Sequence, residues 1–556
     1  MSERAEQAAA LGLTAMAAVL HLLRLEYAGA LWRDEAGAVQ LAAMRLREIW
    51  ALFLQDAFPL LFTGTLRAYT GLFGDSDTAF RLLGLAVGLA ILVALWWNAR
   101  LAGALPLVSI VLVQFHPVMP TYGDSIRGYG LGTLAILLTF GAFARLVGRP
   151  DRKAILLATL AAVASVHLLL HNAALLAGIG AAAAIVGLLR RRFRVAVAAL
   201  GVGLTAALSL LVYAGPLNAA RDWRVVVIVP ITLQRVLGKL REVLGIPFPW
   251  LVWVWGGAVA LAAGITLWKA LKKDQLPPLP VGEVGRADAP TTPTLTEPNL
   301  ADDARLFRLL VIPAALGGEI AFLIAVGYVP RPWYLLPVLA LMASALDGLL
   351  AAGGPAPVRV ARIAAAALLA AALYTIAVHS AKVRMTNVDL VAQSIDQRAG
   401  PRDLVLVNEY YFGVSFHRYY RGDTRWMTVP PLTDHRIHRF DLLKAQLGSE
   451  DPLGEVRRAM RRTLYSGHRV WVVGNLHLPP EGHPTPWLPP APHSPLGWRD
   501  GPYTYAWTQQ IGVFLKTHAV QERRLLVTDG RPVSGLEWVR IWIYQGWKAS
   551  PPGTPD

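Results

Sequence analysis

Residues 173–194 read AALLAGIGAAAAIVGLLRRRFR, an uncharged run that ends in a cluster of arginines. A helix that spans a membrane needs about 20 mostly apolar residues, and basic residues just beyond a span favour the cytoplasmic side. The same succession of apolar run and basic cluster recurs further along the chain. This stretch therefore predicts a helical membrane fold, and also the direction in which the chain crosses the membrane.

The composition agrees with a membrane protein. Of the 556 residues, 54% are hydrophobic and 16% are charged, whereas about 25% are charged in an average globular domain. A soluble enzyme is a poor match to this balance. Eleven apolar stretches are candidates for membrane-spanning helices, at roughly residues 8–25, 80–97, 102–119, 128–147, 154–170, 173–189, 195–214, 250–270, 305–327, 331–350 and 361–379.

Basic clusters predict the orientation. They follow the fourth, sixth, eighth and tenth stretches and contain Arg145, Arg149, Arg152, Lys153, Arg190, Arg191, Arg192, Arg194, Lys269, Lys272, Lys273, Arg359 and Arg362. With eleven spans, all of them lie on one side, which we expect to be the cytoplasm. The N-terminus is then inside and the C-terminal tail outside. Most of the net charge of +16 belongs to the membrane part, which argues against nucleic-acid binding.

Four regions lie outside the predicted spans. Residues 26–79 and 215–249 form long loops on the outward face, the side opposite the basic clusters, and 233–244 is predicted to be an amphipathic helix on the membrane surface. The proline-rich residues 274–304 are predicted to be a disordered cytoplasmic linker. The membrane domain is expected to end at residue 384, and 385–556 to form a soluble periplasmic α/β domain.

The tail shows local signals for strands and helices. Short apolar runs predict buried strands at 403–407 and 469–473, and the alternating run 539–544 predicts an edge strand. Helices are expected near residues 411–420, 453–465 and 505–518, and a long loop over 479–503. The tail's eight histidines, among them His435 and His438, lack the spacing of a metal site and are predicted to lie at the surface.

The sequence Arg33-Asp34-Glu35 follows the first apolar stretch, within the first outward loop. Adjacent carboxylates beside a membrane are costly unless they are solvated, paired or used. A functional interpretation is that one of them, kept ionised by Arg33, acts as a general base. A structural interpretation is that they stabilise the N-terminus of the next helix. The local pattern leaves both open.

Two further motifs follow this pair. They are QDAFPL at residues 55–60 and LFGDSDTAFRL at 72–82. In this order the motifs resemble the GT-C class of membrane glycosyltransferases, in particular the protein O-mannosyltransferase-like and aminoarabinose-transferase-like enzymes. That family has an Asp-Glu pair in its first outward loop and an acidic residue before a His-Pro-Pro-like segment, where this chain has Ala57-Phe58-Pro59. The resemblance covers most of residues 8–380.

The resemblance implies transfer of a sugar from a polyprenyl-phosphate donor to an envelope acceptor, on the periplasmic face and with inversion. Asp34 would be the catalytic base, and Glu35 would help to hold the acceptor. The chain has no nucleotide-binding fingerprint such as G-x-G-x-x-G, which fits a lipid-linked donor. The sugar stays open, as does the acceptor, which is a glycolipid, a polysaccharide or a protein. A composition rich in Ala, Arg and Gly favours a bacterial inner membrane.

The resemblance also implies residues that bind the substrate. Asp124, Arg127 and Tyr129 lie in or beside the second outward loop, the short one between the third and fourth predicted spans, and are similar to the family's Gln-Glu-x-Arg-x-Tyr element. Arg331 and Tyr334 are similar to its Arg-Tyr element, which opens a late span, and an arginine there would suit a lipid phosphate. The structural alternatives are residues that anchor the chain at the interface and an arginine that extends toward the headgroups.

A divalent metal ion is a further implication. Some members of the family bind one through an acid in the first outward loop and a histidine in a later one, and the matching residues are Asp56 and His171. A carboxylate and an imidazole suit zinc or manganese. The alternative for His171 is a hydrogen-bonded residue at a helix end. Because the chain has no cysteine, thiolate metal sites and disulfides are excluded.

Two other classes of protein compete with the enzyme. A transporter or flippase would have internal repeats, broken helices and charged sites near the membrane midplane, whereas most of the candidate residues gather in outward loops. A receptor-like or assembly protein would use its tail to bind a partner. Glu319 and Asp347 fall within predicted spans, which by default makes each a candidate for function.

Overall fold

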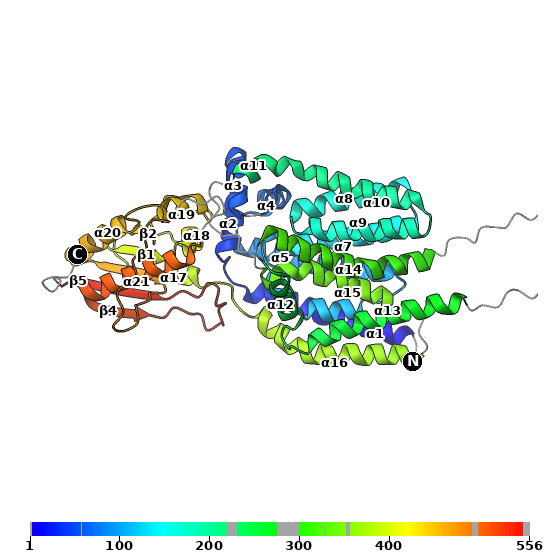
Figure 1. The fold of residues 1–556 in the computed structure, drawn as a ribbon. Coiled ribbons are helices and arrows are strands. Elements are labelled where there is room, and N and C mark those ends of the chain that lie inside the picture. Colours follow the sequence, from blue (N-terminus) through cyan, green and yellow to red (C-terminus); the bar gives the residue numbers. More distant parts are fainter. Residues whose placement is uncertain are drawn as a thin grey trace, which may run out of the picture.

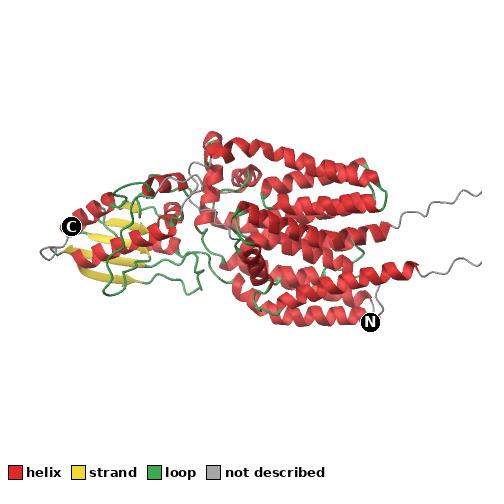
Figure 2. Cartoon of the chain, viewed as in Figure 1, coloured by secondary structure: helices red, strands yellow, loops and turns green. Residues whose placement is uncertain are grey.

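The protein consists of a bundle of long helices with a smaller α/β domain at one end (Figures 1 and 2). The computed structural model describes residues 3–56, 58–219, 231–274, 300–327, 330–351, 356–491 and 499–548. The predicted linker 274–304 therefore lies mostly outside the described residues, as does part of the predicted loop 215–249.

The protein is a multi-pass membrane protein. Among the residues that the structure describes, nine helices are long and apolar enough to cross a membrane. They are α1 (Glu3–Tyr27), α5 (Asp77–Leu101), α7 (Gly128–Gly148), α9 (Asn172–Leu189), α10 (Phe193–Ser209) continued by η3 (Leu210–Tyr213) and α11 (Ala214–Ala219), α13 (Leu251–Asp274), α14 (Leu300–Val326), α15 (Leu336–Leu350) preceded by η5 (Pro332–Leu335), and α16 (Ala356–Ala381).

The other two predicted spans differ from these nine. Residues 102–119 do not form one continuous helix, because Pro106 and Pro117 remove backbone donors. The segment is divided into α6 (Leu107–Ser109), η1 (Ile110–Gln114) and η2 (Met119–Gly123). The predicted span 154–170 is α8 (Arg152–Leu168), which has 17 residues and packs beside α7 and α10.

Asp347 stabilises this interrupted segment. Its carboxylate accepts the backbone N–H groups of Val108 at 2.8 Å and of Ser109 at 3.2 Å. These are donors at the start of a helix, which have no partner within the helix itself. The buried acid in α15 therefore has a structural explanation.

The basic clusters gather at one end of the bundle. Asp303, at the start of α14, pairs with Arg190 at 3.1 Å and with Arg192 at 2.8 Å, both just beyond α9. Glu6 of α1 pairs with Arg362 of α16 at 2.7 Å. Figure 1 shows the N-terminus at this end, away from the α/β domain. We call it the basic end, and the opposite end the tail-facing end.

The first predicted outward loop is largely helical. It contains α2 (Arg33–Ala43), α3 (Leu46–Asp56) and α4 (Leu60–Phe73), which lie at the tail-facing end (Figure 1). The helix predicted at 233–244 is confirmed as α12 (Leu233–Leu244). Thr232 caps its first turn, and its buried side chains Val236, Leu240 and Val243 recur at helical spacing.

The C-terminal domain contains a mixed five-stranded sheet in the order β2-β1-β3-β5-β4. Its elements are α17 (Val388–Asp396), β1 (Leu404–Asn408), η6 (Tyr410–Phe412), α18 (Gly413–Tyr419), β2 (Arg425–Thr428), α19 (Phe440–Leu447), α20 (Gly454–Tyr465), β3 (Arg469–Gly474), α21 (Gly501–His518), β4 (Ala519–Leu525) and β5 (Ile541–Trp547). The strands β2, β1 and β3 are parallel, with Leu406 of β1 opposite Met427 and Val472.

The strands predicted at 403–407 and 469–473 are confirmed as β1 and β3. The run at 539–544 is also a strand, β5, but its prediction as an edge strand is wrong, because β5 pairs with β3 on one side and with β4 on the other. The charged strand β4, with an exposed sequence QERR at 521–524, forms the edge on this side of the sheet, and β2 forms the other edge. Charged side chains protect such an edge from pairing with another chain.

Candidate functional site

Asp34 lies in the first turn of α2, at the junction between the bundle and the C-terminal domain. Its carboxylate is 28% exposed. Its Oδ1 atom accepts a hydrogen bond from Nε2 of His438 at 3.2 Å, and Nε of Arg33 is 3.8 Å away. His438 belongs to the C-terminal domain, so two parts of the chain meet at this carboxylate.

The surroundings of Asp34 favour its ionised form. Burial alone would raise its pKa, but the hydrogen bond from His438 and the positive charges of Arg127 and Arg33 outweigh burial and lower the pKa well below its usual value. Asp34 is therefore a carboxylate at neutral pH. A partly exposed, ionised carboxylate is able to accept a proton or a hydrogen bond from a ligand.

Glu35 is placed quite differently from its neighbour. Its side chain is 0% exposed and binds the Arg81 guanidinium through both oxygens, at 2.8 and 2.9 Å. It also accepts the backbone N–H groups of Ile126 at 2.9 Å and of Trp32 at 3.3 Å. Of the two interpretations of the acidic pair, the structural one therefore applies to Glu35, whose contacts join α2, α5 and the second outward loop.

Arg127 links the first two outward loops. It donates to the backbone oxygen of Asp34 at 2.8 Å and forms an ion pair with the Asp56 carboxylate. Its guanidinium also lies 4.4 Å from the ring centroid of Phe58. Tyr129 packs edge-on against the same ring, with 5.3 Å between centroids. The predicted residues Arg127, Tyr129 and Asp56 therefore lie together beside Asp34.

Asp124 is not part of this group. Its carboxylate is buried and forms a hydrogen bond with Nδ1 of His21 at 2.8 Å. Nε2 of the same ring lies 3.0 Å from the side-chain oxygen of Gln114. His21 belongs to α1, so Asp124 joins that helix to the second outward loop. Asp124 was predicted to bind substrate, but in the structure its carboxylate is paired with His21 of the protein itself.

Arg331 and Tyr334 lie at the start of η5, beside an aromatic cluster. Trp333 stacks on Tyr122 with 4.3 Å between ring centroids, and Tyr334 lies 5.5 Å from Tyr129. Arg331 is exposed, and together with Arg24 and Arg33 it is near enough to the Tyr122 phenol to act on it electrostatically. Positive charge thus surrounds one side of the Asp34 region.

Arg24 was not identified from the sequence. It lies in the last turn of α1, is buried, and donates through Nη1 to the backbone oxygen of Val383 at 2.5 Å. Its Nη2 atom has no hydrogen-bond partner within the described residues. A buried guanidinium with an unused donor is costly unless a further acceptor binds it.

The predicted metal ligands do not form a metal site in the part of the chain that the structure describes. Asp56 is paired with Arg127, and the His171 ring packs against Phe322 and Tyr334, 5.3 and 5.1 Å between centroids. The described residues hold no group of three or more His, Asp or Glu side chains that could bind an ion. Asp56 already binds the guanidinium of Arg127 where a metal ion would have to lie, and this does not fit the metal hypothesis.

The C-terminal domain covers the Asp34 region. The backbone N–H of Arg33 donates to Glu537 at 2.8 Å, its Nη1 donates to the backbone oxygen of Leu536 at 2.6 Å, and its guanidinium lies 4.7 Å from the Tyr411 ring. Burial raises the pKa of Glu537 to about 7. The expectation that His438 lies at the surface is wrong, because its side chain is only 13% exposed and contacts Asp34.

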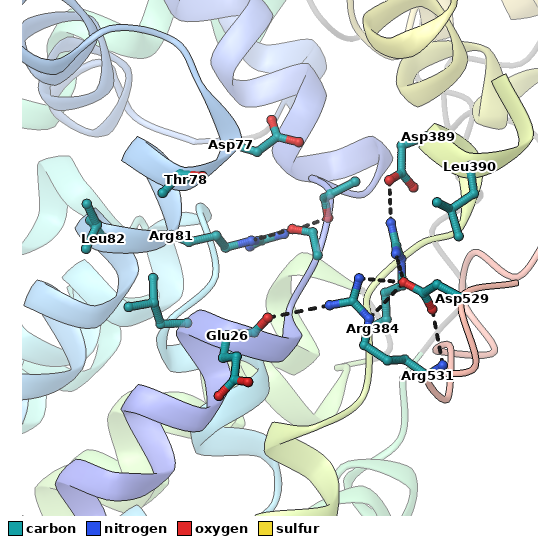
Figure 3. A pocket seen from close by; sticks show the side chains of 13 residues that line it. Glu26, Asp77, Thr78, Arg81, Leu82, Arg384, Asp389, Leu390, Asp529 and Arg531 are labelled. Atoms are coloured by element: carbon teal, nitrogen blue, oxygen red, sulfur yellow. Dashed lines mark hydrogen bonds and ion pairs between the residues drawn. The ribbon is translucent and has the colours of Figure 1, made fainter. Parts of the chain in front are cut away.

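A cavity of about 420 Å³ lies near this site, with Arg81 in its wall (Figure 3). The figure shows Arg384 between Asp389 and Asp529, and both acids pair with it. Asp529 also binds Arg531 at 2.5 Å. Because its arginines are already paired with carboxylates of the protein, this cavity offers little free positive charge to a ligand.

The sequence matches no protein-family model, and no curated protein is significantly similar to it.

Proposed function

We propose that this protein is an integral membrane glycosyltransferase that moves a sugar from a polyprenyl-phosphate donor to an envelope acceptor on the periplasmic face. One observation carries the proposal. Of the acids predicted in the first two outward loops as site residues, Asp34 keeps an ionised and partly exposed carboxylate, whereas Glu35, Asp56 and Asp124 are buried and paired. This leaves one group available to act as a base.

In the proposed reaction, Asp34 accepts the proton of an acceptor hydroxyl. The hydroxyl oxygen attacks the anomeric carbon from the face opposite the phosphate, and the bond between that carbon and the phosphate oxygen breaks. The electron pair leaves with the polyprenyl phosphate, which stays in the membrane. A single displacement inverts the anomeric configuration, and the proton on Asp34 is later released to water.

The leaving phosphate needs nearby positive charge. Arg24 and Arg331 are suited to supply it, because Arg24 has a buried donor without a partner among the described residues and Arg331 is exposed. Tyr129 and Tyr334 would form an aromatic wall beside them. Arg33 is less suited to this role, since Leu536 and Tyr411 already hold its guanidinium.

Glu35 has a different role in this proposal from the one that the resemblance implied. Both of its oxygens already bind Arg81 and backbone N–H groups, so it has little capacity left for an acceptor. We propose that Glu35 holds α2 in position and thereby orients Asp34.

A transporter or flippase is the second candidate, and one observation favours it. His21, Asp124 and Gln114 form a buried polar network on α1 and the interrupted segment, and such networks mark ion or substrate pathways in many transporters. The two functions differ in what they move, because an enzyme transfers a sugar between molecules and a transporter changes the side on which a solute lies.

Purified full-length protein in proteoliposomes separates the two candidates. The donor is a radiolabelled sugar on a polyprenyl phosphate, and the acceptor is an extract of bacterial envelope lipids, glycans and proteins. We expect label to appear in the acceptor fraction, without protein-dependent movement of free sugar or lipid-linked sugar across the bilayer. Movement of either one without any transfer would reject the enzyme and support the transporter.

A further inference from the structure

The segment 436–440 of the C-terminal domain is fixed to α2, which carries Asp34, and to the neighbouring helix α3. Gln40 of α2 donates to the backbone oxygen of Arg436 at 2.8 Å, and Gln55 of α3 accepts the backbone N–H of Phe440 at 3.0 Å. Between them Ile437 is buried in an apolar cluster with residues of both helices. Contacts on both sides of His438 therefore set the position of its backbone.

The side chain of His438 is also constrained. Its ring stacks on Phe440 with 5.8 Å between centroids and 21° between planes, and its Nε2 lies 3.2 Å from Oδ1 of Asp34. Because the carboxylate has no proton to give, Nε2 is the donor. No described residue donates a hydrogen bond to Oδ2, so one oxygen of Asp34 is held and the other is left open.

We propose that His438 is a positioning residue for the transfer reaction, and that the C-terminal domain is therefore part of the active site. This rests on the proposed function. His438 holds Oδ1 of Asp34 through its Nε2–H, so that Oδ2 faces the acceptor hydroxyl and receives its proton. The imidazole keeps its own proton throughout, and no bond to it forms or breaks.

This role predicts an effect on the pH dependence of the reaction. The charged or titratable groups that act on Asp34, or on which it acts, come from several elements and are Arg33, Asp56, Tyr122, Arg127, Tyr129, His438 and Glu537. Loss of the His438 bond removes one of the interactions that stabilise the carboxylate. Asp34 then becomes protonated, and inactive as a base, at a higher pH.

Three variants of the full-length protein test the inference. His438→Ala removes the donor, whereas His438→Gln keeps an N–H group near the position of Nε2. The control is His483→Gln, an exposed histidine whose hydrogen bonds within the described residues are to the backbone oxygens of Pro480 and Glu481. The measurements are kcat/KM for transfer from the radiolabelled polyprenyl-phosphate sugar, from pH 8 down to the lowest pH at which each protein stays folded, together with the Tm of each protein.

We expect His438→Ala to lower kcat/KM at pH 7 by about tenfold to a hundredfold, the usual effect of one hydrogen bond to a charged group. Its acid limb should move to higher pH, His438→Gln should recover most of the rate, and His483→Gln should match the wild type. An active wild type with an unshifted acid limb in His438→Ala would overturn the inference, and so would equal losses in Ala and Gln. A wild type without transfer would instead reject the proposed function itself.

Discussion

Each end of the helical bundle has an acid near two arginines, and the two acids differ in their exposure and in their hydrogen-bond partners. At the basic end, Asp303 is 3% exposed and its carboxylate is bound by Arg190 and Arg192. At the tail-facing end, Asp34 lies near Arg33 and Arg127 but is 28% exposed, and its hydrogen bond comes from a histidine of another domain. The carboxylate of Asp303 is buried and joins helices through its two arginines. The carboxylate of Asp34 has a hydrogen bond to one oxygen, and its other oxygen has no donor among the described residues. The difference separates a stabilising carboxylate from one available for chemistry.

The largest effect is expected for Asp34→Asn. The amide keeps the shape of the side chain and can still accept from His438, but it cannot take a proton, so transfer should fall by about 10²–10⁴-fold, the usual cost of losing a general base. Expression and Tm should stay close to the wild type. Retention of more than about a tenth of the wild-type turnover would show that Asp34 is not the base.

Glu35→Gln should mainly lower the stability of the folded protein, and any loss of transfer should follow from that. It removes the charge that neutralises the buried Arg81 guanidinium, and breaking a buried pair by removing one partner costs about 3–5 kcal/mol. Thermal unfolding in detergent would reveal a large fall in Tm. An unchanged Tm with a selective loss of acceptor binding would restore the role in acceptor binding that the family resemblance implied.

Glu537 should make stability depend on pH. Its pKa of about 7 in the folded protein exceeds the usual value of about 4.3 in an unfolded chain. Between these values the folded state binds more protons, so stability falls as pH rises and is level above about pH 7. The full effect is about 4 kcal/mol. Glu537→Gln keeps an acceptor for Arg33 and should remove this fall, as unfolding measured at several pH values would reveal.

Asp303→Asn is expected to have the smallest effect. It weakens the charged hydrogen bonds to Arg190 and Arg192, each of which is worth about 1.5–3 kcal/mol when it is well formed. Because Arg190 is half-exposed, the free energy of unfolding should fall by an amount near the lower end of this range, about 1.5 kcal/mol. Tm should fall slightly while transfer stays within about twofold of the wild type. A loss of transfer as large as that of Asp34→Asn would remove the contrast between the two ends.

Local patterns in the sequence predicted much of the fold. Apolar runs indicated the long helices and the strands β1, β3 and β5, because burial in a membrane or a sheet requires such runs. The short strand β2 and the charged edge strand β4 lack this signal. The interrupted segment after α5 is apolar enough that the sequence predicted a continuous span there, and its prolines were the signal that this prediction did not use.

The candidate site was predictable only where its residues are close in sequence. The pair Asp34-Glu35 is visible as a motif, but nothing in it distinguishes the open acid from the buried one. That difference depends on Arg81, 46 residues away from Glu35, and on His438, 404 residues away from Asp34. Contacts over such separations leave no periodic signal, and a single sequence offers no covariation.

The most direct measurement compares transfer by three purified proteins in parallel, namely the wild type, Asp34→Asn and Asp303→Asn, with the same labelled polyprenyl-phosphate sugar and envelope extract. The wild type and Asp303→Asn should transfer label at similar rates, and Asp34→Asn should be slower by at least about a hundredfold. Equal transfer by all three proteins, or none by a folded wild type, would contradict the assignment of the chemistry to the tail-facing end.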